Sequence, residues 1–286
     1  MTIIKAILLG LIQGLTEFIP ISSTAHLTIA GHLLNVIDPK HPEDWTAFIA
    51  VIQLGTLLAV IVYFWSDIVA IIRGFVTANL GILKKRPITK ADKQNAWLGW
   101  LVIIGTLPVA ILGLALKRII EGPFTKDLRV IAFGVIFVAL LLVVAEIVGK
   151  QKRDLETIKS GDAITVGVAQ VFALIPGFSR SGSTICGGLF SGLTREAAAR
   201  FSFLLSIPAI AASGLLELPK ALHSVSAGWA SLGVATLVAA ISGYLSIAFL
   251  LNYLKRHTTY LFVGYRLALG LLLIALLMAG RLTAQG

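Results

Sequence analysis

Residues 13–27 read QGLTEFIPISSTAHL and form a polar stretch inside otherwise apolar sequence. Its polar side chains include Glu17, Ser22, Ser23, Thr24 and His26. An acid and a histidine are costly in a lipid-embedded segment, and such residues are functional by default. Pro20 cannot continue a helix and disfavours helix at Ile19, so we predict a break there. Any of the three hydroxyl residues after the break can cap the helix that restarts.

A second polar stretch, IPGFSRSGST, occupies residues 175–184. Gly177 and Gly182 bracket its centre and let the backbone turn sharply and approach a ligand. Ser181, Ser183 or Thr184 is predicted to cap the following helix. A helix N-terminus beside Arg180 predicts an anion site, and the planar fork of arginine suits phosphate. The alternative is that Arg180 only pairs with Glu17 and joins the two stretches.

The composition is that of a membrane protein. Of 286 residues, 57% are hydrophobic and 13% are charged, whereas a soluble domain is about 25% charged. The apolar runs recur from end to end, so we predict an all-α, polytopic protein with one integral membrane domain, residues 1–286. The net charge of +10 is explained by basic loops that orient such a protein, and no nucleic-acid partner is expected. The single Cys186 excludes an intrachain disulfide and a cysteine-based metal site.

Six long apolar segments can each span a bilayer, which needs about 20 helical residues. They cover residues 45–72, 97–117, 129–149, 196–218, 226–254 and 259–279. The polar stretches interrupt two further regions, residues 1–37 and 163–192. We predict that both are re-entrant or broken helical hairpins, because irregular backbone at membrane depth must line a cavity or be buried in protein.

The two halves of the chain resemble each other. GLIQGLTEFIP at 10–20 is echoed by GVAQVFALIP at 167–176, and each is followed by a Ser/Thr cluster and three long apolar segments. Basic loops at 73–93 and 150–159 are separated by two spans, so both are predicted to be cytoplasmic, although the basic segment 117–129 then lies outside. Residues 1–149 and 160–286 are therefore predicted to be inverted repeats, whose broken helices meet near the bilayer midplane.

The polar residues of the first stretch can support chemistry. Helical spacing puts Ser23 and His26 on one face, and Glu17 can fold back over them from the other side of the break. A serine, a histidine and a carboxylate can supply a nucleophile and its activation. The same carboxylate could instead hold a divalent cation. The structural alternative is a capped helix with a satisfied histidine and a paired glutamate.

Two motifs, TEFIPISST at 16–24 and PGFSRSG at 176–182, give the chain a resemblance to the bacterial undecaprenyl pyrophosphate phosphatases, also called bacitracin-resistance proteins. The resemblance covers essentially the whole chain. It implies hydrolysis of undecaprenyl diphosphate to undecaprenyl phosphate and inorganic phosphate, which recycles the carrier lipid for peptidoglycan synthesis. It also implies a divalent cation, Mg²⁺ or Ca²⁺, and a multi-pass protein of the bacterial inner membrane with its site open to the periplasm.

The resemblance assigns roles to individual residues. Catalytic roles fall to Glu17, Ser23, His26 and Arg180, and Glu17 is also the expected metal ligand. The expected substrate-binding residues are Gln13, Ser22, Thr24, Ser179, Ser181, Gly182, Ser183 and Thr184. Two positions depart from the family pattern: Gln13 stands where the pattern has its first acid, and Ala25 where a glycine often follows the hydroxyl cluster. The first departure puts a second carboxylate ligand in doubt.

The mechanism expected from these residues is attack by Ser23 on the terminal phosphorus, with His26 or Glu17 taking its proton. Attack by an activated water is the alternative. The expected partners are a polyprenyl diphosphate substrate and membrane lipid, and the sequence leaves a homodimer open. A transporter or flippase for an anionic or lipid-phosphate substrate is the rival function, because broken helices in inverted repeats are characteristic of transporters. The type 2 phosphatidic acid phosphatases are excluded, because their histidine position is occupied by Cys186.

Overall fold

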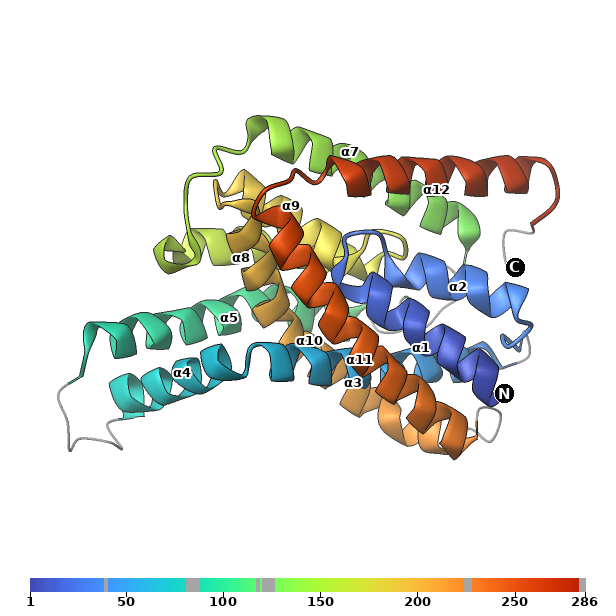
Figure 1. Cartoon of the computed structure of the whole chain (residues 1–286), viewed down its shortest axis with the longest axis horizontal. Coiled ribbons are helices and arrows are strands. Elements are labelled where there is room, and N and C mark those ends of the chain that lie inside the picture. The colour runs from blue at the N-terminus through green and yellow to red at the C-terminus, as the bar shows by residue number, and fades with distance from the viewer. Residues whose placement is uncertain (39–40, 81–87, 117–118, 120–126, 224–227, 283–286) are drawn as a thin grey trace.

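The computed structural model describes residues 1–38, 41–80, 88–116, 119, 127–223 and 228–282. Helices dominate the described residues (Figure 1), with one isolated β-bridge between Arg153 and Leu193. The α-helices are α1 (Ile3–Phe18), α2 (Ser23–Leu33), α3 (Pro42–Tyr63), α4 (Trp65–Phe75), α5 (Lys90–Ala115), α7 (Leu128–Val148), α8 (Ser160–Val171), α9 (Arg180–Phe190), α10 (Arg195–His223), α11 (Trp229–Leu254) and α12 (Tyr260–Met278). The all-α prediction is confirmed.

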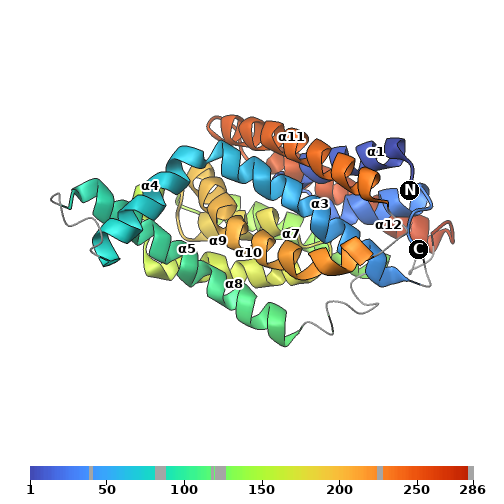
Figure 2. The same ribbon diagram turned by 90° about the horizontal axis from the view of Figure 1, so that it is seen from below.

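Within the described residues, six helices are long and apolar enough to cross a bilayer, namely α3, α5, α7, α10, α11 and α12. They correspond one for one to the six predicted spans, so the polytopic architecture is confirmed. The segment predicted at 45–72 is divided, because α3 ends at Tyr63 and α4 begins at Trp65. The buried Phe64 leaves helical geometry between them (φ −99°, ψ 22°), and α4 then packs along α5 (Figure 2).

Several of the basic residues used to predict the topology lie outside the described residues. These are Lys84, Lys85, Arg86, Lys117, Arg118 and Lys126. The orientation in the membrane therefore stays a prediction.

Both polar stretches break a helix, as predicted. The first break, residues 19–22, separates α1 from α2, and the second break, residues 175–179, separates α9 from α8 and its short 3₁₀ extension. Each break ends on a serine with positive φ, Ser22 at 77° and Ser179 at 63°. Each of these serines caps the next helix by accepting from the amide three residues on. The predicted cap in the second half was wrong, because Ser179 takes that role and not a later hydroxyl.

The similarity between the two halves also includes the packing of their broken helices. A Cβ added at Gly10 of α1 would lie 2.4 Å from the carbonyl oxygen of Ala235 in α11. A Cβ added at Gly167 of α8 would lie at the same 2.4 Å from the carbonyl oxygen of Gly105 in α5. Both broken helices therefore approach a long helix at a glycine in the same place of the repeated sequence. The re-entrant path and the inverted relation of the halves stay predictions.

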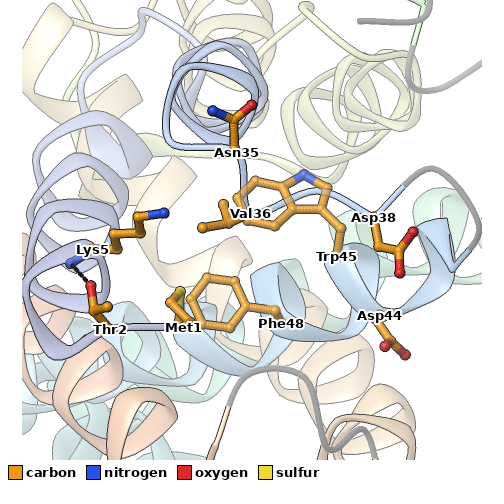
Figure 3. Close-up of a pocket in the computed structure, with 9 residues that line it drawn as sticks. All are labelled: Met1, Thr2, Lys5, Asn35, Val36, Asp38, Asp44, Trp45 and Phe48. Carbon is orange, nitrogen blue, oxygen red and sulfur yellow. Dashed lines mark hydrogen bonds between the residues drawn. The ribbon is translucent and has the colours of Figure 1, made fainter.

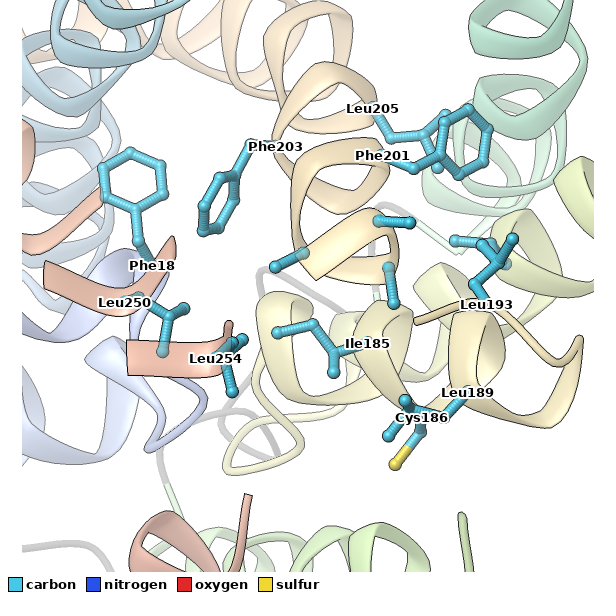
Figure 4. Packing of buried hydrophobic residues seen from close by; sticks show 14 of the residues in the cluster. Phe18, Ile185, Cys186, Leu189, Leu193, Phe201, Phe203, Leu205, Leu250 and Leu254 are labelled. Carbon is cyan, nitrogen blue, oxygen red and sulfur yellow. The ribbon is translucent and has the colours of Figure 1, made fainter. Parts of the chain in front are cut away.

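The largest hydrophobic cluster lies beside the two breaks (Figure 4). Phe18, the last residue of α1, packs edge to face on Phe203 of α10 with ring centroids 5.2 Å apart. Ile185 and Leu189 of α9 are fully buried in the same cluster. The end of α1 and the whole of α9 are thereby fixed against α10, which fixes the backbone from which the polar side chains project.

Candidate active site

Glu17 is the centre of a buried polar cluster. It lies in the last turn of α1 and is 5% exposed. Its Oε2 accepts from Gln13 Nε2 at 2.9 Å and from Ser23 Oγ at 2.7 Å, and its Oε1 accepts from Arg180. These four residues, called the Glu17 cluster below, lie on the helices that flank the two breaks and unite the two polar stretches.

Arg180 is the first residue of α9, and its placement bears out the pairing with Glu17 that the structural alternative proposed. A second nitrogen, Nη1, donates to the carbonyl oxygen of Ser206 in α10 at 3.3 Å. The guanidinium has five N–H donors, and these bonds to described residues use two of them. The arrangement therefore both joins the halves and leaves donors for an anionic ligand.

The other hydroxyls of the second stretch divide into two groups. Ser179 and Ser181 lie beside the cluster, with their Oγ atoms 3.2 Å apart, and Ser181 Oγ also donates to Ile19 O of the first break. Ser183 and Thr184 are buried and bond elsewhere: Ser183 donates to Phe178 O, and Thr184 Oγ1 lies 2.6 Å from Ser202 Oγ of α10. The second pair contributes to helix packing in this arrangement and does not contact Glu17. Gly182 donates its amide to Ser179 Oγ.

His26 is oriented away from Ser23. Its Nδ1 lies 2.7 Å from the carbonyl oxygen of Ser22, which can only accept, so Nδ1 carries a proton. Its Nε2 faces the hydroxyl of Tyr265 at 2.6 Å, and the two rings stack with centroids 5.5 Å apart. The Ser23 hydroxyl donates to Glu17 instead. Of the two proton acceptors that the sequence left open, the geometry favours Glu17.

The remaining residues of the first stretch have structural contacts. Ser22 is 1% exposed and its hydroxyl serves the cap of α2. Thr24 lies half-buried in the first turn of α2. Gln13 is fully buried, and its Oε1 has no hydrogen-bond partner among the described residues.

The donor set at the site can be tested against a divalent cation. No group of three or more His, Cys, Asp and Glu side chains within the described residues could hold a metal ion. Hard cations such as Mg²⁺ and Ca²⁺ take oxygen ligands, including amide carbonyls, and Mg²⁺ binds through few carboxylates together with substrate phosphates. The unpartnered Gln13 Oε1 beside the Glu17 carboxylate fits that second arrangement.

Sequence reasoning assigned no site role to Tyr265 or to Arg266. Both belong to α12, and Arg266 is fully buried. The signal available in the sequence was the polar pair Tyr265–Arg266 within an apolar span. Their partners could not be deduced, because Tyr265 contacts His26, 239 positions away, and Arg266 bonds to distant backbone carbonyls.

A cavity of about 460 Å³ lies elsewhere, at the start of α1 (Figure 3). It is lined by Met1, Thr2, Lys5, Asn35, Val36, Asp38, Asp44, Trp45 and Phe48. Lys5 and Glu17 are 12 positions apart on α1, which is about 18 Å along a helix. The cavity is therefore separate from the Glu17 cluster, and Lys5 Nζ in its wall donates to Leu34 O at 2.6 Å.

Comparison with known proteins covers nearly all of this chain. A family model described as "Bacitracin resistance protein BacA" matches residues 6–272. The chain belongs to the BacA family. The region matched by the BacA family includes the whole Glu17 cluster as well as Tyr265 and Arg266.

Curated relatives give the same result at the level of whole chains. A protein named undecaprenyl-diphosphatase from Syntrophobacter fumaroxidans is 54% identical over 271 residues, which are 94% of this chain and 95% of the relative. One of the same name from Chloroherpeton thalassium is 47% identical over 99% of this chain and 100% of its own length. Another from Myxococcus xanthus is 48% identical over 99% and 92%.

Proposed function

We propose that this protein hydrolyses undecaprenyl diphosphate to undecaprenyl phosphate and inorganic phosphate. The relatives that carry the name undecaprenyl-diphosphatase match almost the full chain at up to 54% identity. The observation that carries the chemistry is the hydrogen bond of 2.7 Å from Ser23 Oγ to Glu17 Oε2, next to the guanidinium of Arg180. In the cell, this reaction returns the carrier lipid to peptidoglycan synthesis and gives resistance to bacitracin.

The substrate has a long apolar tail and a diphosphate head. A cluster buried among membrane-spanning helices lets the tail stay in lipid while the head reaches polar groups. Arg180 holds the phosphates through the donors that protein groups leave open, and the first-turn amides of α9 add partial positive charge. Ser179 and Ser181 border the cluster. Ser179 donates a further hydrogen bond to the head, and Ser181 does the same when its hydroxyl turns away from Ile19 O.

The reaction follows from the order of contacts. Ser23 Oγ attacks the terminal phosphorus while Glu17 Oε2, its hydrogen-bond acceptor, takes the hydroxyl proton. The bond between the terminal phosphorus and the bridging oxygen breaks, and undecaprenyl phosphate leaves. Glu17 passes the serine proton to the released phosphate before water hydrolyses the phosphoserine; Glu17 then accepts a proton from that water and returns it to Ser23 Oγ as the bond between phosphorus and Oγ breaks. In the alternative, water attacks directly and Ser23 only positions it; a phosphoserine trapped by acid quench separates the two.

A divalent cation, Mg²⁺ or Ca²⁺, would be held by Glu17 and Gln13 Oε1 together with phosphate oxygens of the substrate. When bound, it neutralises charge on the transferred phosphoryl group. Gln13 supplies an uncharged oxygen to such a site, so the protein contributes one carboxylate.

The protein belongs in the bacterial cytoplasmic membrane, with the Glu17 cluster open to the periplasmic side. Support comes from the two basic loops that the sequence predicts to be cytoplasmic. Labelling of cysteines introduced at Lys150 and Asn35 with a membrane-impermeant reagent tests this. We expect labelling in whole cells at Asn35 only; labelling at Lys150 instead would show the opposite orientation.

Whether two copies associate is a separate question, which light scattering of the purified protein answers.

Phosphate release by the purified protein in detergent tests the function. We expect release from undecaprenyl diphosphate that depends on Mg²⁺ or Ca²⁺ and stops on chelation. A folded protein that binds the lipid without releasing phosphate, but moves it between leaflets of a vesicle, would establish the transporter alternative.

A further inference from the structure

Arg266 makes an unusual set of contacts for a buried cation. Its side chain is fully buried within α12. Nη1 donates to Pro20 O at 3.1 Å, and Nη2 donates to Gly177 O at 2.9 Å and to Gly134 O at 3.2 Å. Nε donates to Val135 O at 3.0 Å. All four bonds to described residues end on backbone carbonyls.

Two of the four carbonyls that Arg266 satisfies belong to irregular backbone. Pro20 lies in the first break and Gly177 in the second, where the chain has left helical geometry and its carbonyls lack the usual helical partner. A buried carbonyl without a donor is costly, and so is a buried charge without hydrogen bonds. The Arg266 guanidinium therefore supplies donors to these carbonyls and gains hydrogen bonds for its own charge. It also links the first break to the second.

The two breaks lead directly to the reacting groups. Ser23 begins α2 three residues after Pro20, and Arg180 begins α9 three residues after Gly177. Holding both carbonyls on one planar fork fixes the start of α2 relative to the start of α9. That spacing determines how Ser23 Oγ, Glu17 and the Arg180 guanidinium face the same phosphate.

The second break is also held from the side of α7. A Cβ added at Gly134 would lie 2.6 Å from Pro176 O, and one added at Gly177, where φ is +88°, would lie 2.2 Å from Ile131 O. The second break thus packs against α7 so closely that a methyl group at Gly134 or Gly177 would not fit. Arg266 bonds to α7 at that same level, through Gly134 and Val135.

We propose that Arg266 is a positioning residue for the phosphatase reaction, acting through the backbone of both breaks without touching the substrate. This inference rests on the proposed function, because its readout is phosphate release. Lysine cannot replace it, since an ammonium group donates from one point and cannot span four carbonyls on opposite sides.

Arg266→Lys in the full-length protein tests the proposal. We expect kcat for phosphate release to fall about 30-fold or more, as displacements near 1 Å do, with KM changed less than about threefold. Arg200→Lys is the matched control, because Arg200 pairs with Asp67 and stacks over Phe64, neither of which belongs to a break, and it should keep wild-type kcat. Added to Ser23→Ala, the Arg266→Lys change should cost little more, since a misplaced Ser23 and a missing one fail at the same step.

If Arg266→Lys does not fold, a second variant tests the positioning role of Arg266. Gly134→Ala keeps the guanidinium but pushes the second break away from α7, so kcat should again fall at least tenfold with KM nearly constant. Gly264→Ala, on α12 next to Tyr265, meets nothing within 4 Å and should behave as wild type.

Three results separate the possible failures. No phosphate release by the wild type contradicts the proposed function itself. An active wild type whose folded Arg266→Lys or Gly134→Ala variant loses less than threefold in kcat contradicts only the positioning role. A full multiplicative loss in the Ser23→Ala background contradicts positioning through Ser23, because Arg266 would then act independently of that residue.

Discussion

Glu17→Gln is the perturbation that most directly probes the chemistry of the cluster. The amide keeps the size of the side chain but cannot take the proton of Ser23, whose Oγ lies 2.7 Å from Glu17 Oε2. A positioned general base contributes about 10²–10⁴ in rate, which is about 3–5 kcal/mol at 1.36 kcal/mol per tenfold. The substitution also leaves Arg180 without its carboxylate. We therefore expect phosphate release below about 1% of wild type.

The same change should also lower the free energy of unfolding, by an amount that follows from the remaining contacts of Arg180. Removing one partner of a buried ion pair costs about 3–5 kcal/mol. Arg180 retains the Ser206 carbonyl and a side-chain exposure of 15%, so about 2 kcal/mol is the expected loss. Thermal unfolding in detergent measures this, and inorganic phosphate should recover part of it by supplying an anion to Arg180.

Glu196→Gln is the control for this prediction. Glu196 Oε1 lies 3.8 Å from Lys255 Nζ in a partly exposed pair, so neither activity nor unfolding should change. Glu17→Gln with more than a tenth of wild-type activity would refute the assignment of Glu17 as the proton acceptor.

Three further predictions concern neighbours of Glu17. Arg180→Lys should lower kcat/KM at least about 100-fold in phosphate-release assays, because the planar fork for phosphate is lost. Near-normal activity would contradict the role of Arg180 in binding phosphate. His26→Ala should lower the rate of phosphate release less than Glu17→Gln does. Adding Tyr265→Phe to His26→Ala should lower the rate little further, since the two side chains share one hydrogen bond; additive losses in a double-mutant cycle would show separate roles. Gln13→Glu should lower the Mg²⁺ concentration for half-maximal activity several-fold by adding a carboxylate, and an unchanged titration would exclude Gln13 from the cation site.

Local sequence rules were sufficient for the helices and the breaks. Pro20 and Gly177 lie where helices end, and the long apolar runs gave all six spanning helices. The division at Phe64 was missed, because no proline or glycine marks it and the kink depends on a ring buried against Phe203.

The site was predictable only as a set of residue types. Two polar stretches in an apolar chain indicated that Glu17, Ser23 and Arg180 belong together, and the structure places them in contact. The orientation of His26 was not predictable, because helical spacing puts it near Ser23 while Tyr265, 239 positions away, draws its ring elsewhere. The partners of Arg266 are backbone oxygens, which carry no sequence signature.

Phosphate release from undecaprenyl diphosphate by the wild type and by Ser23→Ala tests the central claim most directly. The account predicts cation-dependent release by the wild type and less than about 1% of that rate in the variant, as expected for loss of a nucleophile. A Ser23→Ala protein that releases phosphate at the wild-type rate would contradict the assignment of Ser23 as the nucleophile.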